Sequence, residues 1–305
     1  MPPPTDIHNP FEGPGDFTLS SDMQSTTYDF VDPTKLDFTG KVIFITGASG
    51  TLGRAAAISF AKAGASNIAL AARSDLTPVR QDVEAAAQSV GRRKPKVLTL
   101  HIDVIDQKSV EMAAARVEEV FKFCDVVINY AGAASMPGKV ADTDPAAWWD
   151  MIQVNLFGSY LVARSFLPLL AKGGEARYLI LVSGVSAHIT LPKMSSYQIA
   201  KLGVVRLAEC IDKEYAEEGI ICINIHPGNV FTKLIRGIFD KIPPEIKHVF
   251  TETPELSGDT LTFLTSEERS WLGGRYLSMA WDMENLMGLE EDIVEDEKLL
   301  VHLKC

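Results

Sequence analysis

The stretch Val42-Ile43-Phe44-Ile45-Thr46-Gly47-Ala48-Ser49-Gly50-Thr51-Leu52-Gly53 decides how this chain folds. Its first four residues are apolar and mostly β-branched, which predicts a buried strand, and the residues that follow predict a helix. Glycines between a strand and a helix let the backbone approach a pyrophosphate, which the free N–H groups and the positive end of the helix dipole would hold. The pattern therefore predicts a dinucleotide site, although a tight strand-to-helix turn alone would also use these glycines.

Short apolar runs recur along the chain and are separated by stretches of helix length. Because the runs are continuous and do not alternate with polar residues, they indicate strands that are buried on both faces. The expected strands are 42–45, 68–70, 97–100, 126–128, 178–182 and 220–223, and the expected helices are 52–64, 78–90, 107–122, 145–171 and 196–218. This order predicts an α/β fold with a doubly wound parallel sheet of about seven strands, which binds its ligands at the carboxyl ends of the strands.

Three parts of the chain depart from this rhythm. Residues 1–38 are rich in Pro, Ser, Thr and Asp, and we expect a poorly ordered N-terminal arm ahead of a domain at 39–283. The apolar segment 229–256 follows the sixth strand, and we interpret it either as a substrate lid or as a surface helix pair that covers the core. Residues 284–305 are acidic and predict a solvated tail or a subunit contact.

The composition is that of a soluble globular protein that acts on a small molecule. A chain of 305 residues with 46% hydrophobic content can bury one large core. A formal net charge of −11 disfavours nucleic acid and anionic membranes as partners. The cysteines at 124, 210, 222 and 305 lack metal-ligand spacing, so we expect no metal site and reduced thiols in the cytoplasm. We expect no export signal and no membrane span.

The residues after the second and third expected strands bear on which dinucleotide binds. Ala71-Ala72-Arg73-Ser74 has no carboxylate where a ribose 2′-hydroxyl would be held, whereas Arg73 is able to pair with a 2′-phosphate. This favours NADP(H) over NAD(H), unless Arg73 is merely a solvated cation. Asp103 follows the third strand, and it either accepts a hydrogen bond from the adenine amino group or caps a turn.

Tyr197 and Lys201 lie four residues apart within an expected helix, so their side chains share one face. An ammonium beside a phenol favours the phenolate, and we expect Lys201 to lower the pKa of Tyr197 and make it a usable proton donor and acceptor. The pair by itself is a weak signal, and it gains weight from the glycine-rich turn about 150 residues earlier. Together the two patterns predict a hydride-transfer site.

By these motifs, residues 38–280 resemble the short-chain dehydrogenase/reductase family. Thr46 to Gly53 resembles its nucleotide-binding turn, Asn129-Tyr130-Ala131-Gly132 its Asn-Asn-Ala-Gly segment, and Pro227-Gly228 through Thr232 its nicotinamide contact. The resemblance implies a Rossmann-type fold, a nicotinamide cofactor, and a homodimer or homotetramer packed through two long helices. With Arg73 and Asp103 added, the expected cofactor-binding residues are Gly47, Ser49, Gly50, Thr51, Leu52, Gly53, Arg73, Asp103, Asn129, Ala131, Gly132, Tyr197, Lys201, Pro227, Gly228, Val230 and Thr232.

The resemblance also implies a catalytic group of Tyr197, Lys201, Asn155 and a serine. The family's serine lies thirteen residues before the tyrosine, where this chain has Gly184, whereas Ser183 lies fourteen and Ser186 eleven residues before it. Either the following loop at 189–193 carries one extra residue and Ser183 serves, or the hydroxyl is lost. We expect the insertion, because loops absorb a residue at little cost.

Two smaller departures concern the cofactor motifs. Thr51 stands where the family's turn usually has glycine, with Gly50 just before it, a spacing closer to the extended branch of the family. Tyr130 replaces the second asparagine of the Asn-Asn-Ala-Gly segment.

We expect a reversible reduction of a ketone to a secondary alcohol. Tyr197 would donate the proton, Ser183 would hydrogen-bond the carbonyl oxygen, and Lys201 would also hold the nicotinamide ribose, with Asn155 supporting a water that links Lys201 to solvent. The apolar segment 229–256 favours a bulky, uncharged substrate, with contacts from Ser183, His188, Tyr197, Phe231 and Leu234. Two other hypotheses remain: a redox-neutral cyclisation, dehydration or isomerisation on the same fold, and a non-catalytic nucleotide-binding module.

Overall fold

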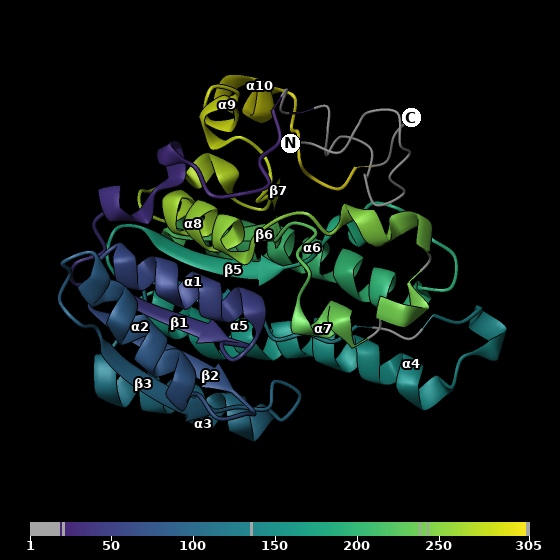
Figure 1. Ribbon diagram of the computed structural model, residues 1–305, viewed down its shortest axis with the longest axis horizontal. Helices are drawn as coiled ribbons and strands as arrows, with labels where there is room; N and C mark the ends of the chain where they lie inside the picture. The colour runs from purple at the N-terminus through teal and green to yellow at the C-terminus, as the bar shows by residue number, and fades with distance from the viewer. Residues whose placement is uncertain (1–18, 20–21, 135–136, 238, 243, 303–305) are drawn as a thin grey trace.

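The computed structural model describes residues 19, 22–134, 137–237, 239–242 and 244–302. Within them, seven parallel strands form one sheet in the order β3-β2-β1-β4-β5-β6-β7, with helices on both faces (Figure 1). This arrangement confirms the predicted fold class, a Rossmann-type doubly wound parallel sheet. The strands are β1 (Val42–Thr46), β2 (Asn67–Ala72), β3 (Lys96–His101), β4 (Val126–Asn129), β5 (Arg177–Val182), β6 (Ile220–His226) and β7 (Tyr276–Ser278).

Alternate side chains of the central strands enter two separate hydrophobic cores. In β1, Ile43 and Ile45 pack into the first core, whereas Val42 and Phe44 pack into the second. The ring of Phe44 stacks on Phe166 from the helix layer below it, with 3.9 Å between the ring centroids. Both faces of the strand are therefore apolar, which is why its sequence is a continuous apolar run.

Each core is covered by its own layer of helices (Figure 1). The first core lies under α1 (Thr51–Lys62), α2 (Thr77–Ser89) and α8 (Pro254–Leu264), and the second under α3 (Gln107–Phe121), α5 (Gly158–Leu170) and α6 (Ser195–Tyr215). A further helix, α4 (Pro145–Ile152), continues through a π-helical turn at Gln153–Phe157 into α5. No described helix combines the length and the apolar character that a bilayer span needs.

The described part of the N-terminal segment packs against the domain, which corrects the expectation of a poorly ordered arm up to residue 38. Met23 forms an antiparallel bridge with Trp281, and Thr27 Oγ1 donates to the Asp259 carboxylate of α8 over 2.6 Å. Val31 and Phe38 are buried in the first core. A few well-placed apolar side chains anchor a segment whose overall composition is polar. Residues 1–18 and 20–21 lie outside the described residues.

The C-terminal segment is also packed and is not a solvated tail. It forms α9 (Met283–Met287) and α10 (Glu290–Glu295), which bury Met283, Leu286 and Ile293 in the first core. The carboxylates of Glu290 and Glu291 are on the exposed side of the same helix. The acidic residues therefore lie on the outer face of a short amphipathic helix, whose inner face is apolar. The prediction of a solvated tail took account of the acidic residues alone.

Candidate active site

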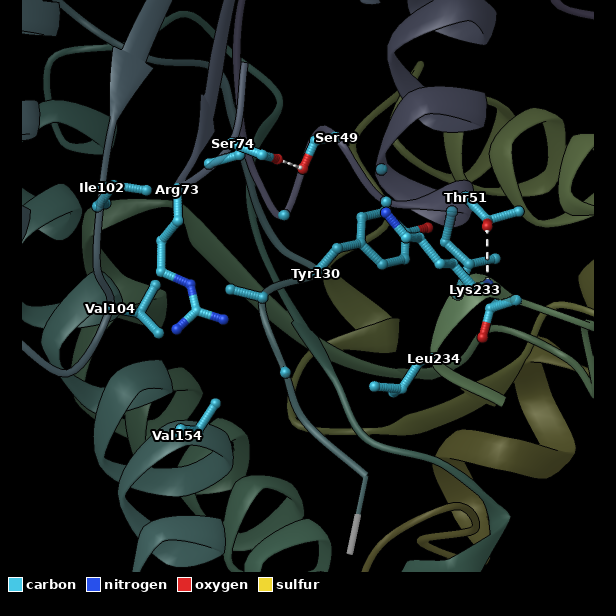
Figure 2. A pocket seen from close by; sticks show the side chains of 18 of the residues that line it. Ser49, Thr51, Arg73, Ser74, Ile102, Val104, Tyr130, Val154, Lys233 and Leu234 are labelled. Carbon is cyan, nitrogen blue, oxygen red and sulfur yellow. Dashed lines mark hydrogen bonds between the residues drawn. The ribbon is translucent and has the colours of Figure 1, made fainter. Parts of the chain in front are cut away.

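A cleft of about 450 Å³ opens at the carboxyl ends of the central strands, beside the turn between β1 and α1 (Figure 2). Such a position is where doubly wound sheets bind their ligands. Its lining includes the expected cofactor residues Gly47, Ser49, Gly50, Thr51, Leu52, Gly53, Arg73, Asp103, Ala131, Gly132 and Thr232. The structure thus brings residues from five separate parts of the sequence around one hollow.

Two glycines of the turn are required by packing of the backbone. Gly47 has a φ of +63°, and a Cβ there would lie 2.8 Å from the backbone nitrogen of Ala131. A Cβ at Gly53 would lie 2.5 Å from the carbonyl oxygen of Gly47. Real Cβ atoms do not approach backbone this closely, so the turn, the loop after β4 and α1 can only meet here through glycine.

The first turn of α1 faces the cleft with free donors. Its N-cap is Gly50, which supplies no side-chain acceptor, so the first N–H groups of the helix remain available for an anion. Thr51 Oγ1 accepts a hydrogen bond from Lys233 N at 3.3 Å, and Ser74 Oγ donates to Ser49 Oγ at 2.8 Å (Figure 2). The donor set at this helix end therefore fits the pyrophosphate of a dinucleotide.

Arg73 extends from the end of β2 into the cleft (Figure 2). It is exposed, and its guanidinium forms no ion pair or hydrogen bond with any residue in the described part of the chain. Asp103 lines the same cleft, and its Oδ1 accepts a hydrogen bond from Ile105 N at 3.3 Å, which closes a turn. The turn role of Asp103 is thus observed, and its contact with adenine stays a prediction.

Asn129 does not line the cleft, which corrects its assignment as a cofactor contact. Its Oδ1 accepts from Thr46 Oγ1 at 2.6 Å, and its Nδ2 donates to Ser159 Oγ at 2.9 Å. Thr46 Oγ1 in turn accepts from Ala131 N at 3.1 Å. The buried amide therefore locks the ends of β1 and β4 together beneath the cleft, because all of its hydrogen bonds are made inside the protein.

A second cavity of about 250 Å³ adjoins the cleft. The two spaces share the lining residues Leu52, Tyr130, Gly132, Thr232 and Leu234, so they lie directly side by side. The second cavity contains the expected catalytic and nicotinamide-contact residues Asn155, Ser183, Tyr197, Lys201, Pro227, Gly228 and Val230. The cofactor cleft and the catalytic group, which were inferred from separate motifs, are therefore adjacent.

Tyr197 and Lys201 project from the start of α6, and Lys201 Nζ lies 5.5 Å from the centre of the Tyr197 ring. Burial raises the pKa of Tyr197 to about 12, and the neighbouring Ser186 hydroxyl acts in the opposite direction. Burial also lowers the pKa of Lys201 to about 8, while its Nζ donates to Val182 O at 2.9 Å. The pKa of Tyr197 is therefore raised because burial outweighs the Ser186 hydroxyl, and the expectation that Lys201 lowers it stays a prediction.

Asn155 lies in the π-helical turn and holds the loop after β4. Its Nδ2 donates to Ala133 O at 3.1 Å and to Met151 O at 3.0 Å, and its Oδ1 accepts from Ala133 N at 3.2 Å. Gly132 lies between Asn155 and Lys201, since a Cβ there would be 3.0 Å from Asn155 Oδ1 and 3.9 Å from Lys201 Nζ. The structure thus brings Asn155 and Lys201 together, and the water that we expect to link them stays a prediction.

Ser183 does not offer its hydroxyl to the cavity. Its Oγ donates to Lys201 O at 2.9 Å, and a hydroxyl has a single hydrogen to give. This geometry contradicts the expectation that Ser183 donates to a substrate carbonyl. The hydroxyl beside Tyr197 belongs instead to Ser186, which lies in the short turn Val185–Ala187 after β5 and is 6% exposed. The two hydroxyls are neighbours, although Ser186 Oγ has no hydrogen bond of good geometry within the described residues.

Of the two expected substrate contacts on the segment 229–256, Leu234 faces the cavity and Phe231 does not. Leu234 lines both the cleft and the cavity. Phe231 is not among the lining residues, and its ring packs edge-on against Phe239 and Phe250, with centroids 4.9 and 6.5 Å away. Phe250 does line the cavity. Phe231 therefore supports the wall from behind, and closure of this segment as a lid stays a prediction.

His188 lies outside the cavity that contains Tyr197, which corrects its assignment as a substrate contact. It lines a separate hollow of about 640 Å³ formed with the C-terminal segment, and its ring meets Tyr276 edge-on at 4.3 Å between centroids. The turn Val185–Ala187 lies between β5 and His188. After this turn, the His188 side chain faces the C-terminal segment and not the Tyr197 cavity.

Two polar residues of the cavity were given no role from the sequence: Ser186, for which only the spacing from Tyr197 was noted, and His226. His226 ends β6 and is 8% exposed, and burial together with the nearby His188 lowers its pKa to about 4. It lies three residues beyond the expected strand 220–223 and directly before Pro227-Gly228, and this position was a usable signal. Tyr130, which we noted only as a departure from a motif, also lines both spaces.

Comparisons with known proteins agree with this geometry. A family model described as short chain dehydrogenase matches residues 41–242. The protein "Short chain dehydrogenase pigC" of Monascus ruber is 46% identical over 301 residues, which cover 99% of each chain. "Short chain dehydrogenase tazN" of Aspergillus terreus is 43% identical over 295 residues, 96% of this chain and 63% of that protein.

A solved structure of similar fold is carveol dehydrogenase from Mycobacterium avium in complex with NAD. It superposes with a TM-score of 0.68 at 22% identity, over 78% of this chain and 95% of that chain. The stretch matched by the family model contains the β1–α1 turn, Tyr197, Lys201 and Pro227-Gly228.

Proposed function

Because the chain belongs to the short-chain dehydrogenase family, whose members are oxidoreductases that act on CH–OH groups with NAD(P), we propose that it reduces a bulky, apolar ketone to a secondary alcohol with NADPH. One observation carries the proposal. The unpaired Arg73 and Tyr197 line two adjoining spaces at the carboxyl edge of the sheet, which share five lining residues. The first space suits a dinucleotide and the second a reacting ketone beside it.

Arg73 supports NADP(H) over NAD(H). Its guanidinium points into the cleft (Figure 2), and none of the described residues pairs with it. A 2′-phosphate would pair with it through charge-assisted hydrogen bonds, which a 2′-hydroxyl cannot match. The hydroxyls of Ser49 and Ser74 lie at the same end of the cleft and add neutral donors for a phosphate.

Tyr197 is the proton donor in the proposed reaction. A bound reduced nicotinamide supplies the hydride that becomes the new C–H bond. As the C=O π electrons move onto oxygen, Tyr197 gives its phenolic proton to that oxygen. Burial raises the pKa of Tyr197 to about 12, so the side chain is protonated at neutral pH, which is the form that reduction needs. Lys201, buried beside the ring, stabilises the phenolate that remains.

The cavity wall supports an uncharged substrate. Apolar side chains form most of it, among them Val185, Met194, Ile235, Ile242 and Phe250. Of the described lining residues, Lys201 alone carries a formal charge at neutral pH. A phosphate or carboxylate on the substrate would therefore lose its hydration without gaining a second cation, which is costly.

A homo-oligomer and a cytoplasmic location are also part of the proposal. Large apolar side chains on α4, α5, α6 and the π-helical turn are between 42% and 55% exposed. They are Trp149, Phe157, Tyr160, Ile199 and Leu202. A second copy of the chain would cover such side chains, as expected for helices that pack across a dimer axis. The described cysteines, Cys124, Cys210 and Cys222, are free thiols, which suits a reducing compartment.

A fluorescence titration with NADPH and NADH, followed by a screen of apolar ketones, tests the proposal. We expect tighter binding of NADPH, and consumption of one NADPH for each alcohol formed. Conversion of a substrate without net change in NADPH would support a redox-neutral reaction instead. Tight NADPH binding with no turnover of any ketone would support a nucleotide-binding module.

A further inference from the structure

Two buried polar atoms of the substrate cavity, Ser186 Oγ and His226 Nδ1, have no hydrogen-bond partner among the described residues. Both residues are more than nine-tenths buried, and both line the cavity that contains Tyr197. The other unpaired side-chain atoms in the described chain belong to residues outside this lining. Buried polar groups are almost always hydrogen-bonded, because an unpaired one loses its hydration without compensation. The Tyr197 hydroxyl is the neighbour of Ser186 Oγ, although no hydrogen bond of good geometry joins them. His226 Nδ1 has no such neighbour, and both atoms are therefore available to a ligand in the cavity.

Gly184 marks the space between the two atoms. A Cβ built there would lie 3.6 Å from Ser186 Oγ and 3.9 Å from His226 Nδ1, and apart from the adjoining residues no other atom would come within 4 Å. Gly184 itself lines the cavity, so this space is open to a ligand. A glycine here leaves room for a ligand oxygen between the two polar atoms, where a larger side chain would fill it.

Ser186 and His226 face different parts of a ligand. The Ser186 hydroxyl is the one beside the Tyr197 phenol, so it lies next to the atom that gives up the proton. His226 ends the neighbouring strand, on the other side of the space at Gly184. Burial lowers the pKa of His226 to about 4, so at neutral pH its ring is uncharged and offers one N–H and one lone pair. Such a ring suits a hydroxyl or carbonyl oxygen and not a phosphate.

We propose that the substrate is a dioxygenated ketone, which carries a second hydroxyl or carbonyl oxygen on the α or β carbon. Ser186 and Tyr197 hold the reacting carbonyl, and His226 Nδ1 holds the second oxygen above Gly184. The inference rests on the proposed ketone reduction and names its substrate class. Only the reacting carbonyl gains the hydride from NADPH and the proton from Tyr197, and the second oxygen is unchanged in the product.

Matched substrate pairs test this on the wild-type enzyme, without any dependence on how a variant folds. Tetralone is compared with its α-hydroxy derivative, cyclohexanone with α-hydroxycyclohexanone, and butanone with its β-hydroxy derivative, each with NADPH. We expect kcat/KM to be roughly 10- to 100-fold higher for the dioxygenated member, because a site with unpaired polar groups rejects a ligand that leaves them unpaired. A ratio near one, with turnover of both members, would overturn the inference and leave the ketone reduction standing. If no pair is turned over although NADPH binds, the inference fails, and the ketone reduction fails with it only if the screen of bulky apolar ketones also finds no substrate.

His226→Leu tests the assignment of the second oxygen. It should lower kcat/KM for the dioxygenated member more than for the plain ketone, so that the ratio falls toward one. His226→Asn keeps a polar nitrogen close to the backbone and should retain part of the preference. A ratio that is the same in His226→Leu and wild type, with NADPH binding intact, would contradict the role of His226.

Ser186→Ala tests the assignment of the reacting carbonyl. It should lower kcat by about 10- to 100-fold for both members of a pair and change their ratio little, since it removes a donor that both substrates use. Adding Gly184→Ser to this variant returns a hydroxyl to the same space and should recover part of kcat for the plain ketone. A Ser186→Ala enzyme with wild-type kcat would contradict the role of Ser186.

Discussion

Ser183 Oγ and the backbone oxygen of Lys201 are joined by a hydrogen bond of 2.9 Å, which fastens the end of β5 to helix α6. The Lys201 ammonium makes a second connection, because Nζ donates to Val182 O at 2.9 Å. The helix that carries Tyr197 is therefore held against the sheet edge by a serine next to the position where a catalytic serine is expected. Ser183 acts on the helix backbone, and its neighbour Ser186 is the hydroxyl in the cavity.

Ser183→Ala should lower the free energy of unfolding by about 1 kcal/mol, the usual net worth of one hydrogen bond. It should lower kcat much less than Ser186→Ala does, because it removes no donor from the cavity. Urea unfolding and steady-state kinetics with NADPH measure both effects. If Ser183→Ala lowers kcat more than Ser186→Ala does, at unchanged stability and NADPH affinity, then Ser183 is the residue that donates a hydrogen bond to the substrate carbonyl.

Arg73→Gln should weaken NADPH binding by roughly 10- to 100-fold, the range expected for losing charge-assisted hydrogen bonds to a phosphate. Binding of NADH should change little, because it has no 2′-phosphate. Arg80→Gln is the matched control, since Arg80 is an exposed arginine on α2 that pairs with Glu84 away from the cleft. Fluorescence titration gives all the constants. Equal weakening of NADPH and NADH in Arg73→Gln would refute the 2′-phosphate contact.

Gly47→Ala should destabilise the protein and abolish dinucleotide binding. Its Cβ would lie 2.8 Å from Ala131 N at a positive φ, so the strand ends must move apart. Gly40→Ala is the control, because Gly40 has a φ of +86° but no atom within 4 Å of an added Cβ. The control should cost about 1–2 kcal/mol for backbone strain alone, and Gly47→Ala clearly more. If both variants lose the same free energy of unfolding in urea, the close approach of the Ala131 backbone is not the reason that position 47 requires glycine.

The fold and the cofactor cleft were predictable because their signals are local. The apolar run from Val42 to Ile45 contributes to both cores of a parallel sheet, and a short, continuous, β-branched run is typical of such a strand. The glycines at 47 and 53 are fixed by backbone contacts at the same turn. Every lining residue from this turn could therefore be named from the sequence alone.

Two features could not be predicted from the sequence: which group each serine hydroxyl contacts, and whether the terminal segments pack against the domain. Ser183 and Ser186 lie three residues apart, and only the backbone path after β5 decides which hydroxyl meets α6 and which meets Tyr197. Asn129 belongs to a cofactor motif, yet its amide is satisfied inside the sheet. Burial of Leu286 and Ile293 depends on tertiary contacts that composition does not record.

Stability should fall with rising pH because of Glu252. This residue forms a parallel β-bridge with Val230, which lies in the expected nicotinamide contact from Pro227 to Thr232, and its Oε2 is buried with no partner among the described residues. Burial raises the pKa of Glu252 from 4.5 to about 7. Between these two values the folded protein binds more protons than the unfolded chain. The contribution of Glu252 to the free energy of unfolding is therefore complete below the lower pKa, and it is lost as pH rises through the upper one.

Glu252→Gln should remove this part of the pH dependence. Urea unfolding of both proteins at several pH values between about 4.5 and 8 measures it, and the variant should gain stability relative to wild type as pH rises through about 7. Parallel pH curves for the two proteins would contradict the raised pKa of Glu252.

In the proposed reaction Tyr197 gives a proton to a ketone that bound NADPH reduces. This step is tested by comparing NADPH affinity and single-turnover NADPH oxidation in wild type and Tyr197→Phe, which lacks only the phenolic oxygen. We predict NADPH affinity within about threefold of wild type and oxidation slowed by roughly 100- to 10,000-fold, the range for loss of a general acid. Oxidation by Tyr197→Phe at a rate near that of wild type would contradict the claim.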